Sequence, residues 1–304
     1  MAERLSLFAR PAPEPHRTVT RTLWSAPPQA KYGAMTSDFL TALPGRAVIA
    51  ITGEDARSFL QRVITRGPEG LKPGGALFST LLTPQGKVLA DFIIFDDGEG
   101  GLLIDAPASE AEGLIKRFSL YRLRAKADIA LRDDLAVAAA RGEGEAELRT
   151  VALAAAPDPR NAMLGLRAIV PAGGPQDEAG YEAARIAAIV PELGRDYGPA
   201  EAFSTDVNHD LMAGIDYKKG CFVGQEVASR MHRKGGVRKR TVRLDLDGPA
   251  PEAGTAVTAG AAPLGAITSG AGQRALALIR VDRLDASGGE PVLAGDAPAR
   301  ITLP

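Results

Sequence analysis

The sequence predicts an α+β body followed by a small all-β module, for which a barrel is the expected form. Between residues 47 and 190, apolar β-branched runs alternate with stretches whose apolar residues recur at helical spacing. Residues 241–304 show the period-two alternation of strands instead. Apolar residues make up 45% and charged residues 24% of the chain, so we expect a sizeable core.

The first 34 residues differ from the rest of the chain. They combine five prolines with five Lys or Arg and only two acidic residues, and no hydrophobic periodicity runs through them. An Arg-rich, acid-poor targeting peptide is one interpretation. We expect the other, a disordered tail or an upstream start codon with Met35 as the working initiator.

The body is predicted to begin with a strand and an amphipathic helix. Residues 47–52 form a short apolar, β-branched run that ends at Gly53, as a buried strand does. Thr52 and Asp55 resemble the start of a capping box. The apolar residues that follow have the spacing of one helical stripe: Ala56, Phe59, Leu60, Val63 and Ile64.

A hairpin and two more helices are predicted next. Residues 76–82 and 88–95 are apolar runs on either side of the tetrapeptide Thr83–Gly86, whose proline and glycine suit a turn. Residues 102–104 begin another strand. Ser109 and Glu112 are the expected cap and partner of a second helix, with a strand-rich stretch after it to about residue 170. The third helix is expected over residues 177–190, stopped by Pro191.

The C-terminal module is predicted from alternation. Val242, Leu244 and Leu246 point to one side and the polar residues between them to the other. Residues 275–281 form a later strand run. The body and the module together therefore account for the chain after its first 34 residues.

Composition excludes several classes of protein. Lys plus Arg number 36 and Asp plus Glu 37, so the basic excess of a dedicated nucleic-acid-binding protein is missing. The single cysteine excludes an internal disulfide and a zinc or iron–sulfur site built from cysteines of this chain alone. The sequence contains no run of about 18 apolar residues, so it predicts no transmembrane helix. We expect a reducing compartment, the cytoplasm, or the mitochondrial matrix if the source is eukaryotic.

Common catalytic motifs are missing as well. The sequence contains no H-E-x-x-H, no G-x-S-x-G and no phosphate-binding loop around Gly86. Its three histidines, His16, His209 and His232, are widely separated. We expect each of them to be an ordinary surface or loop residue.

One segment, residues 218–226 with the sequence KKGCFVGQE, concentrates unusual chemistry. The only cysteine, Cys221, follows two lysines and lies between Gly220 and Gly224, shortly before a helix-like stretch. A thiol near ammonium groups and helix N-terminal amides ionises more readily than a free thiol. The glycines allow a tight turn or close approach of a ligand. The alternative is a buried cysteine that packs as a small apolar side chain.

Residues 219–226, K-G-C-F-x-G-Q-E, resemble the signature of the YgfZ family, folate-binding proteins implicated in iron–sulfur cluster assembly. Their mitochondrial counterparts help to mature four-iron, four-sulfur enzymes. The resemblance extends over about residues 35–304 and includes Gly53–Ala56, the Pro84–Asp91 hairpin, Arg185–Pro191 and Gly265–Ser269. The wider superfamily is that of the glycine-cleavage T-protein, a tetrahydrofolate-dependent aminomethyltransferase.

The resemblance implies a T-protein-like fold and a set of site residues. The folate-binding body spans residues 35–240 and the antiparallel β-barrel residues 241–304. Asp91 falls where the T-protein keeps a carboxylate facing the folate, and there it accepts a pterin N–H or a proton; a water-exposed strand-end carboxylate is the alternative. Cys221 is implied as the functional thiol and transient iron–sulfur ligand. The other implied folate-site residues are Arg185, Lys219, Gly220, Gly224, Gln225, Glu226 and Arg238.

Three departures from the family pattern bear on folate binding. Ala187 stands where many relatives carry glutamate, and Ile189 stands where they carry glycine. Thr65-Arg66-Gly67 replaces the usual Thr-Asn/Gln-Asp. These departures weaken the prediction that a pterin is bound as in the T-protein, and they weaken the prediction of aminomethyl transfer further.

The stretch from His232 to Arg240 contains five Lys or Arg residues in nine positions. It is interpreted as an anion site for the glutamate tail of folate, as a contact with RNA or an acidic partner, or as a solvated loop. Because no aromatic residues are interleaved, RNA lacks stacking platforms here. We favour the folate-tail site.

Two functions follow from the resemblance. In the first, the chain binds tetrahydrofolate or a derivative, and Cys221 assists assembly, maintenance or repair of four-iron, four-sulfur enzymes, including radical tRNA-modifying enzymes. Its partners are then client enzymes or assembly proteins, without stable nucleic-acid or membrane binding. In the second, the chain is an enzyme, a tetrahydrofolate-dependent aminomethyltransferase in which Asp91 polarises the folate amine. The T-protein has no cysteine in this segment, so Cys221 favours the first.

Overall fold

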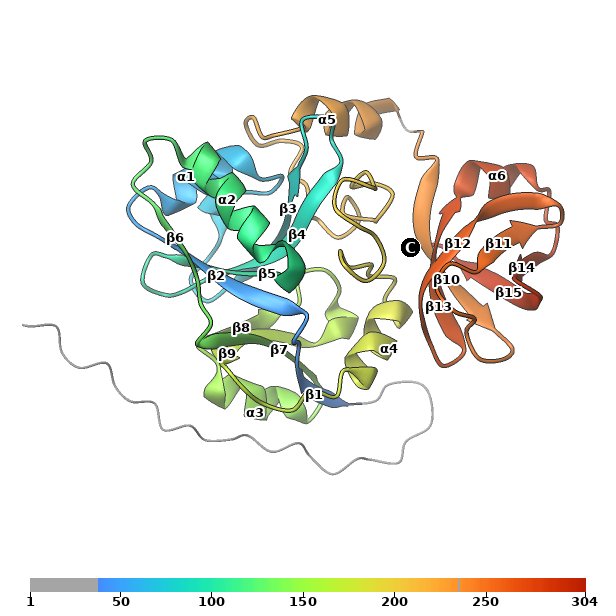
Figure 1. Cartoon of the computed structure of the whole chain (residues 1–304), viewed down its shortest axis with the longest axis horizontal. Coiled ribbons are helices and arrows are strands. Elements are labelled where there is room, and N and C mark those ends of the chain that lie inside the picture. Colours follow the sequence, from blue (N-terminus) through green and yellow to red (C-terminus); the bar gives the residue numbers. More distant parts are fainter. Residues whose placement is uncertain (1–37, 235) are drawn as a thin grey trace, which may run out of the picture.

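The computed structural model describes residues 38–234 and 236–304. The expectation for residues 1–34 therefore lies outside the described residues. Figure 1 shows a body of sheets and helices beside a barrel formed by the strands from residue 239 onward.

A five-stranded antiparallel sheet forms the first half of the body, in the order β3-β4-β5-β2-β6. Helices α1 (Ala56–Val63) and α2 (Ala111–Arg122) cover one face, where the rings of Phe59 and Phe92 both meet Phe118 edge to face. The predicted apolar stripe of α1 is buried in this core. The strands are β2 (Arg46–Thr52), β3 (Ala76–Leu82), β4 (Val88–Asp96), β5 (Leu102–Pro107) and β6 (Asp128–Leu131).

The opposite face of that sheet packs on a second sheet of four strands, in the order β1-β7-β9-β8. Because side chains alternate along a strand, Val48 and Ile93 meet Val137 and Ile169 in this second core. Helix α3 (Gly144–Val151) covers the outer face of the second sheet. Its strands are β1 (Phe39–Ala42), β7 (Leu135–Arg141), β8 (Ala154–Pro157) and β9 (Leu166–Pro171).

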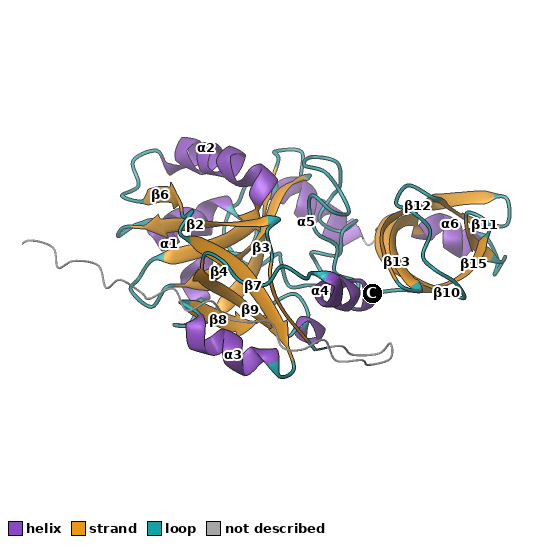
Figure 2. Cartoon of the chain, turned by 60° about the horizontal axis from the view of Figure 1, so that its bottom comes forward, coloured by secondary structure: helices purple, strands orange, loops and turns teal. Residues whose placement is uncertain are grey.

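The C-terminal strands close into a six-stranded antiparallel barrel, in the order β10-β13-β12-β11-β14-β15 (Figure 2), which confirms the predicted module. Val242, Leu244, Val257 and Ile279 fill its interior. The strands are β10 (Lys239–Leu246), β11 (Ala256–Ala259), β12 (Ala262–Ala271), β13 (Arg274–Arg280), β14 (Val292–Ala294) and β15 (Ala297–Thr302), and helix α6 (Val281–Ala286) follows β13.

Helix α4 (Ala179–Ala187) joins the barrel to the body. Ile186 and Ile189 pack against Leu276 of β13. The Arg243 guanidinium of β10 donates to the carbonyl oxygen of Ala187 at 2.9 Å. Apolar and polar contacts thus place the barrel against this end of the body.

The predicted helix caps are wrong in detail. Asp55 precedes α1, but its carboxylate accepts the backbone N–H of Lys126 at 2.8 Å and caps no helical N–H group. Ser109 lies in a short 3-10 turn, and α2 begins at Ala111 without a side-chain cap. The Asp55 carboxylate therefore binds a backbone N–H that is 71 residues away in sequence and not an N–H group at the start of α1.

Two helices also differ from their predicted extent. Helix α3 lies in the stretch predicted to be strand-rich, where only Leu148 and Gly144 of the helix are buried and the apolar signal is weak. The helix predicted over residues 177–190 is α4, which ends at Ala187, before the stop expected at Pro191. Among the described residues, none of the helices combines the length and apolar character needed to cross a bilayer.

Candidate functional site

The loop that contains the cysteine, residues 214–224, leads from the body into helix α5 (Gln225–Lys234); we call it the Cys221 loop. Its only thiol is exposed to solvent, and so is the neighbouring Gly220. The interpretation of Cys221 as a small buried side chain is therefore wrong. The sulfur is open to reagents and to other molecules.

Lys219 fastens the Cys221 loop to α1. Its ammonium donates to the carbonyl oxygens of Gln61 and Ile64 at the C-terminal end of the helix and lies 5.3 Å from the ring centre of Phe222. The last carbonyls of a helix lack helical partners and carry the negative end of its dipole, so a cation is favourable there. Burial lowers the pKa of Lys219 to about 8, which still leaves the ammonium charged at neutral pH.

Backbone contacts hold the same loop at two further points. The N–H of Asp216 donates to the carbonyl of Thr65 at 3.0 Å, and the N–H of Val223 to that of Val63 at 3.4 Å. The Thr65 hydroxyl in turn donates to the carbonyl of Gly214 at 2.6 Å. Thr65, the first residue of the Thr65-Arg66-Gly67 sequence that departs from the family pattern, thus helps to position the loop that contains the cysteine.

Glycines allow the hairpin turn and the start of α5 to approach closely. Gly224 has φ of +79°, and a Cβ there would lie 2.5 Å from the carbonyl oxygen of Thr83. Gly86 has φ of +81°, and a Cβ there would lie 2.8 Å from Val227. Gly224 is therefore required by its left-handed backbone and by the close approach of the hairpin turn, whereas the sequence indicated a tight turn or close approach of a ligand. A Cβ on Gly220 would meet no described atom within 4 Å, so space around it does not require glycine.

A pocket of about 480 Å³ borders the first turns of α5 and is lined by Gln225 and Glu226. The rings of Tyr217 and His232 stack in it, with centres 3.9 Å apart and planes 13° apart. Burial raises the pKa of Tyr217 to about 12, and its hydroxyl has no hydrogen-bond partner among the described residues. The exposure of His232 agrees with its prediction as a surface residue.

Replacing Lys219 with methionine is expected to loosen the Cys221 loop and to lower the free energy of unfolding by about 1–2 kcal/mol, because two charge-assisted hydrogen bonds are lost. Amide hydrogen exchange should become faster in residues 61–65 and 216–223. Lys218→Met, at the exposed neighbouring position, is the matched control and should leave both quantities unchanged. Equal exchange rates in the two variants would show that Lys219 does not fasten the loop.

Asp91, the predicted folate acceptor, is buried and already has partners. Its carboxylate accepts the Tyr197 hydroxyl at 2.5 Å and the N–H of Leu193 at 3.1 Å, and Arg46 lies 3.5 Å away. Only 3% of the residue is exposed. The alternative of a water-exposed carboxylate is therefore wrong, and the acceptor oxygens face the interior of the body.

His209 extends this buried network and corrects its prediction as a surface or loop histidine. It is fully buried; its Nε2 lies 3.0 Å from the Tyr197 oxygen and its Nδ1 lies 2.8 Å from the Thr80 hydroxyl. Because the Asp91 carboxylate only accepts, Tyr197 donates to it, His209 donates from Nε2, and Thr80 donates to Nδ1. Burial lowers the pKa of His209 to about 4, so the ring stays neutral at neutral pH.

Arg185 is also buried, and its donors are used within the fold. The guanidinium pairs with Glu182 and Asp196, and it donates to the Ser269 hydroxyl of β12 at 2.8 Å. Ile189, at the position where the resemblance led us to expect glycine, has φ of +56°, a conformation that suits glycine and strains isoleucine. This end of α4 therefore serves the joint between body and barrel.

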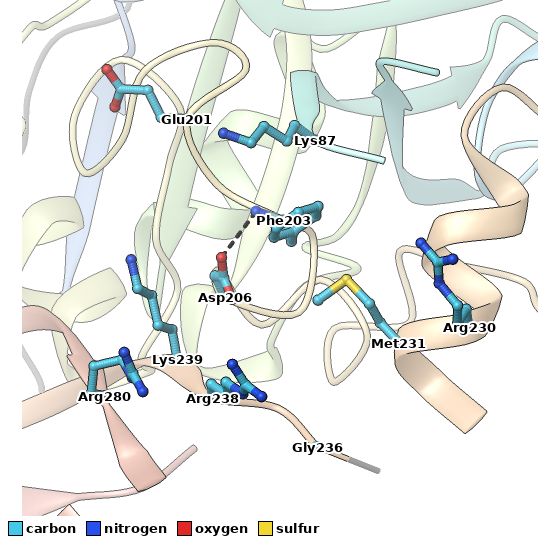
Figure 3. A pocket seen from close by; sticks show the side chains of 10 residues that line it. All are labelled: Lys87, Glu201, Phe203, Asp206, Arg230, Met231, Gly236, Arg238, Lys239 and Arg280. Carbon is cyan, nitrogen blue, oxygen red and sulfur yellow. Dashed lines mark hydrogen bonds between the residues drawn. The ribbon is translucent and has the colours of Figure 1, made fainter. Parts of the chain in front are cut away.

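A second pocket, of about 600 Å³, lies between the body and the barrel; we call it the junction pocket (Figure 3). Glu201 and Asp206 are its acidic lining residues. Its basic lining residues are Lys87, Arg230, Arg238, Lys239 and Arg280. Of these, only Arg280 has an ion-pair partner within the described residues, at Asp282, so the pocket is suited to an anion.

The predicted site residues thus lie in three places. Residues 219–226 belong to the Cys221 loop and the start of α5, Asp91 and Arg185 lie in buried networks, and Arg238 lines the junction pocket. Tyr197 and His209 were missed, because only the fold brings residues separated by more than 100 positions to Asp91. No sequence signal near either residue indicates the contact.

Comparisons with known proteins now decide the family. Residues 238–304 match the family described as the CAF17 C-terminal β-barrel domain. The human iron-sulfur cluster assembly factor IBA57, mitochondrial, is 31% identical over 275 residues, which are 80% of this chain and 77% of the human protein. The chain belongs to the IBA57 family of iron-sulfur cluster assembly factors.

Family membership refines the resemblance noted from the cysteine motif. The IBA57 homologue of Pyricularia oryzae is 35% identical over 217 residues, 66% of this chain and 55% of that protein, so the chain spans about half of its length. The prediction of an iron–sulfur assembly factor agrees with the names of these relatives. The name YgfZ was too specific, since that family is related to IBA57 but distinct from it.

The predicted fold is confirmed by a solved structure. The glycine cleavage system aminomethyltransferase T from Bartonella henselae superposes with a TM-score of 0.68, over 87% of this chain and 84% of that chain, at 18% identity. The IBA57-family chain therefore has the T-protein-like body with a closed C-terminal barrel. At this identity the likeness concerns the fold alone.

Proposed function

We propose that this chain assists the assembly, maintenance or repair of iron–sulfur enzymes through the thiol of Cys221. The exposure of that thiol, on a loop fastened to α1 by Lys219, is the observation that carries the proposal. A cluster normally takes four protein ligands, so a lone thiol supplies one ligand transiently or shares a cluster with a partner protein. Four-iron, four-sulfur enzymes, including radical tRNA-modifying enzymes, are the proposed clients.

The cellular compartment is proposed from the names of the relatives. The curated names of the fungal and human relatives include the word mitochondrial. We place the chain in the mitochondrial matrix if its source is a eukaryote, and in the cytoplasm otherwise. Both are reducing compartments, where an exposed thiol persists.

The junction pocket is the proposed site of a folate derivative. Its lining carries Lys87 after the hairpin turn, Arg230 of α5 and Arg238 before β10, and none of these three cations has an ion-pair partner within the described residues. Carboxylates of a glutamate tail are suited to such a lining. The residues present therefore fit the anionic part of a folate.

Asp91 does not fit the role of pterin acceptor. Its Oδ2 accepts two internal donors and its Oδ1 faces Arg46, so a pterin N–H would have to displace Tyr197 or Leu193. This arrangement counts against the second function, tetrahydrofolate-dependent aminomethyl transfer. The assembly role needs no free acceptor at this position.

Cys221→Ala is expected to abolish the assembly function. In a cell that lacks its own factor of this kind, the wild-type chain should restore a cluster-dependent activity such as radical tRNA thiolation, and the variant should restore at least tenfold less. Met163→Ala, which removes an exposed sulfur elsewhere on the body, is the matched control and should restore full activity. The substituted residue is exposed, so the fold, measured by circular dichroism, should be unchanged.

Two results would contradict the proposal. The first is full complementation by Cys221→Ala. The second is robust glycine-cleavage turnover, with the other cleavage components, that survives the same substitution. The latter result would favour the aminomethyltransferase.

Folate binding is tested separately by thermal unfolding. Tetrahydrofolate at 100 times its dissociation constant should stabilise the chain by about 2.7 kcal/mol, because it binds only the folded state. Arg238→Glu should abolish most of this shift, and Arg149→Glu, an exposed residue of α3, should keep it. The absence of a shift in the wild-type chain at saturating ligand would leave the junction pocket without a folate.

A further inference from the structure

The C-terminal end of α2 carries an apolar and basic surface that no other described residue covers. Leu120 is 74% exposed and Leu123 is 85% exposed, the largest values among the exposed large apolar side chains of the described residues. Lys116 and Arg117 neighbour Leu120 on the helix surface by their spacing, and Arg124 follows Leu123. All three cations are exposed. We call these five residues the α2 patch.

The backbone at Leu123 is strained. It has φ of 50° and ψ of −108°, a conformation that the Cβ of a bulky residue disfavours and that glycine adopts without a clash. Leu123 therefore costs the isolated chain free energy through its backbone, and its side chain contributes little to the core. Strained residues of this kind are concentrated at binding and switching sites.

The cations of the α2 patch are available to a partner. Within the described residues, Lys116, Arg117 and Arg124 form neither ion pairs nor side-chain hydrogen bonds, whereas the nearby Lys126 pairs with Glu54 at 2.5 Å. The whole chain has a formal charge of −1, so this positive charge is local. Acidic groups on a partner would meet it without displacing an internal bond.

We propose that the α2 patch docks a partner protein that presents an apolar pocket rimmed by carboxylates. An exposed apolar group with a polar rim is typical of a protein-binding site, and here the rim has one sign of charge. A lipid surface is disfavoured, because an interfacial helix needs its apolar face free, and Leu114 and Phe118 of α2 are buried against the sheet. Figures 1 and 2 show α2 on the body, away from the barrel.

Photo-crosslinking tests this docking on the full chain. Benzoylphenylalanine at position 120, in cells of the source organism, should give a discrete protein adduct whose crosslinked site lies in an apolar pocket with acidic neighbours. The same probe at position 153, where Leu153 is 52% exposed, is the matched control and should give no such adduct. Changing both Arg117 and Arg124 to glutamate should weaken the adduct at least fivefold.

Leu123→Gly separates docking from folding. Because glycine relieves the strained backbone, this variant should raise the melting temperature by about 2 °C and yet weaken the adduct at position 120 at least threefold. If Leu123 takes no part in docking, the variant should be stabilised in the same way but should keep its adduct at position 120. Adduct formation requires no cluster activity, so this test stands or fails independently of the proposed function.

Three results would overturn the inference. They are the absence of a discrete adduct at position 120, an adduct that survives the double charge reversal, and co-sedimentation of the chain with vesicles of phosphatidylserine and phosphatidylcholine that the same reversal abolishes. The last result would assign the α2 patch to a lipid surface.

Discussion

Asp105→Asn is expected to lower the free energy of unfolding by roughly 3–5 kcal/mol, because it removes the nearest counter-charge of two buried guanidinium groups. Asp105 of β5 is fully buried; its carboxylate accepts Arg46 Nε at 2.6 Å and Arg167 Nε at 2.7 Å. The two arginines hold the pKa of Asp105 below its usual value. Asparagine keeps the shape of the side chain, so the loss reports on charge and hydrogen bonding and not on a cavity.

Urea denaturation at pH 7 measures this loss as a shift of the midpoint at constant slope. Asp134→Asn is the matched control, since it breaks a two-bond pair with Arg132 at the surface, where water screens the interaction. The control should lose about 1 kcal/mol or less. Similar midpoints for the two variants would show that the buried pair contributes no more than an exposed one.

The elements that sequence periodicity predicted are those whose packing depends on one short stretch of chain. The stripe from Ala56 to Ile64 is buried because helical spacing alone places it on one side of α1. The turn at Thr83–Gly86 closes with a bond from the Gly86 N–H to the Thr83 carbonyl at 2.8 Å, as its proline and glycine indicated. Such features can be predicted without knowing which distant residues they contact.

The polar interior could not be predicted, because each of its bonds joins residues far apart in sequence. Arg46 and Asp105 are separated by 59 positions, and Tyr197 and Asp91 by 106. A buried arginine or histidine has the same local sequence signature as an exposed one. Asp91 was therefore interpreted as a ligand acceptor, although in the fold it holds together β4 and the segment around Leu193 and Tyr197.

The cysteine motif lies between these two cases. Its composition favoured a functional thiol over a buried cysteine that packs as a small apolar side chain, and the thiol is exposed. The role of Lys219 was not visible in the motif, because the carbonyls that it caps belong to a helix more than 150 residues earlier. The glycine at position 224 is explained by packing against the hairpin turn, which the motif alone does not reveal.

Lowering the pH from 6.5 to 4 is expected to destabilise the chain by about 3 kcal/mol through His209 alone. Burial lowers the pKa of His209 from 6.5 to about 4 and outweighs the opposing carboxylates of Asp91 and Asp210. Between these two values the unfolded chain binds a proton that the folded chain excludes, so stability falls as the pH falls. Below about pH 4 both states are protonated and this contribution changes no further.

His209→Gln isolates this contribution from that of the carboxylates. Its free energy of unfolding, measured by urea denaturation at steps from pH 7 to pH 4, should decline by about 3 kcal/mol less than that of the wild-type chain over the same range. His232→Gln, at an exposed histidine, should follow the wild-type profile. Parallel profiles for the wild-type chain and His209→Gln would mean that His209 takes up a proton in the folded state, and the chain of bonds from Thr80 through Tyr197 to Asp91 would then have to run in a different direction.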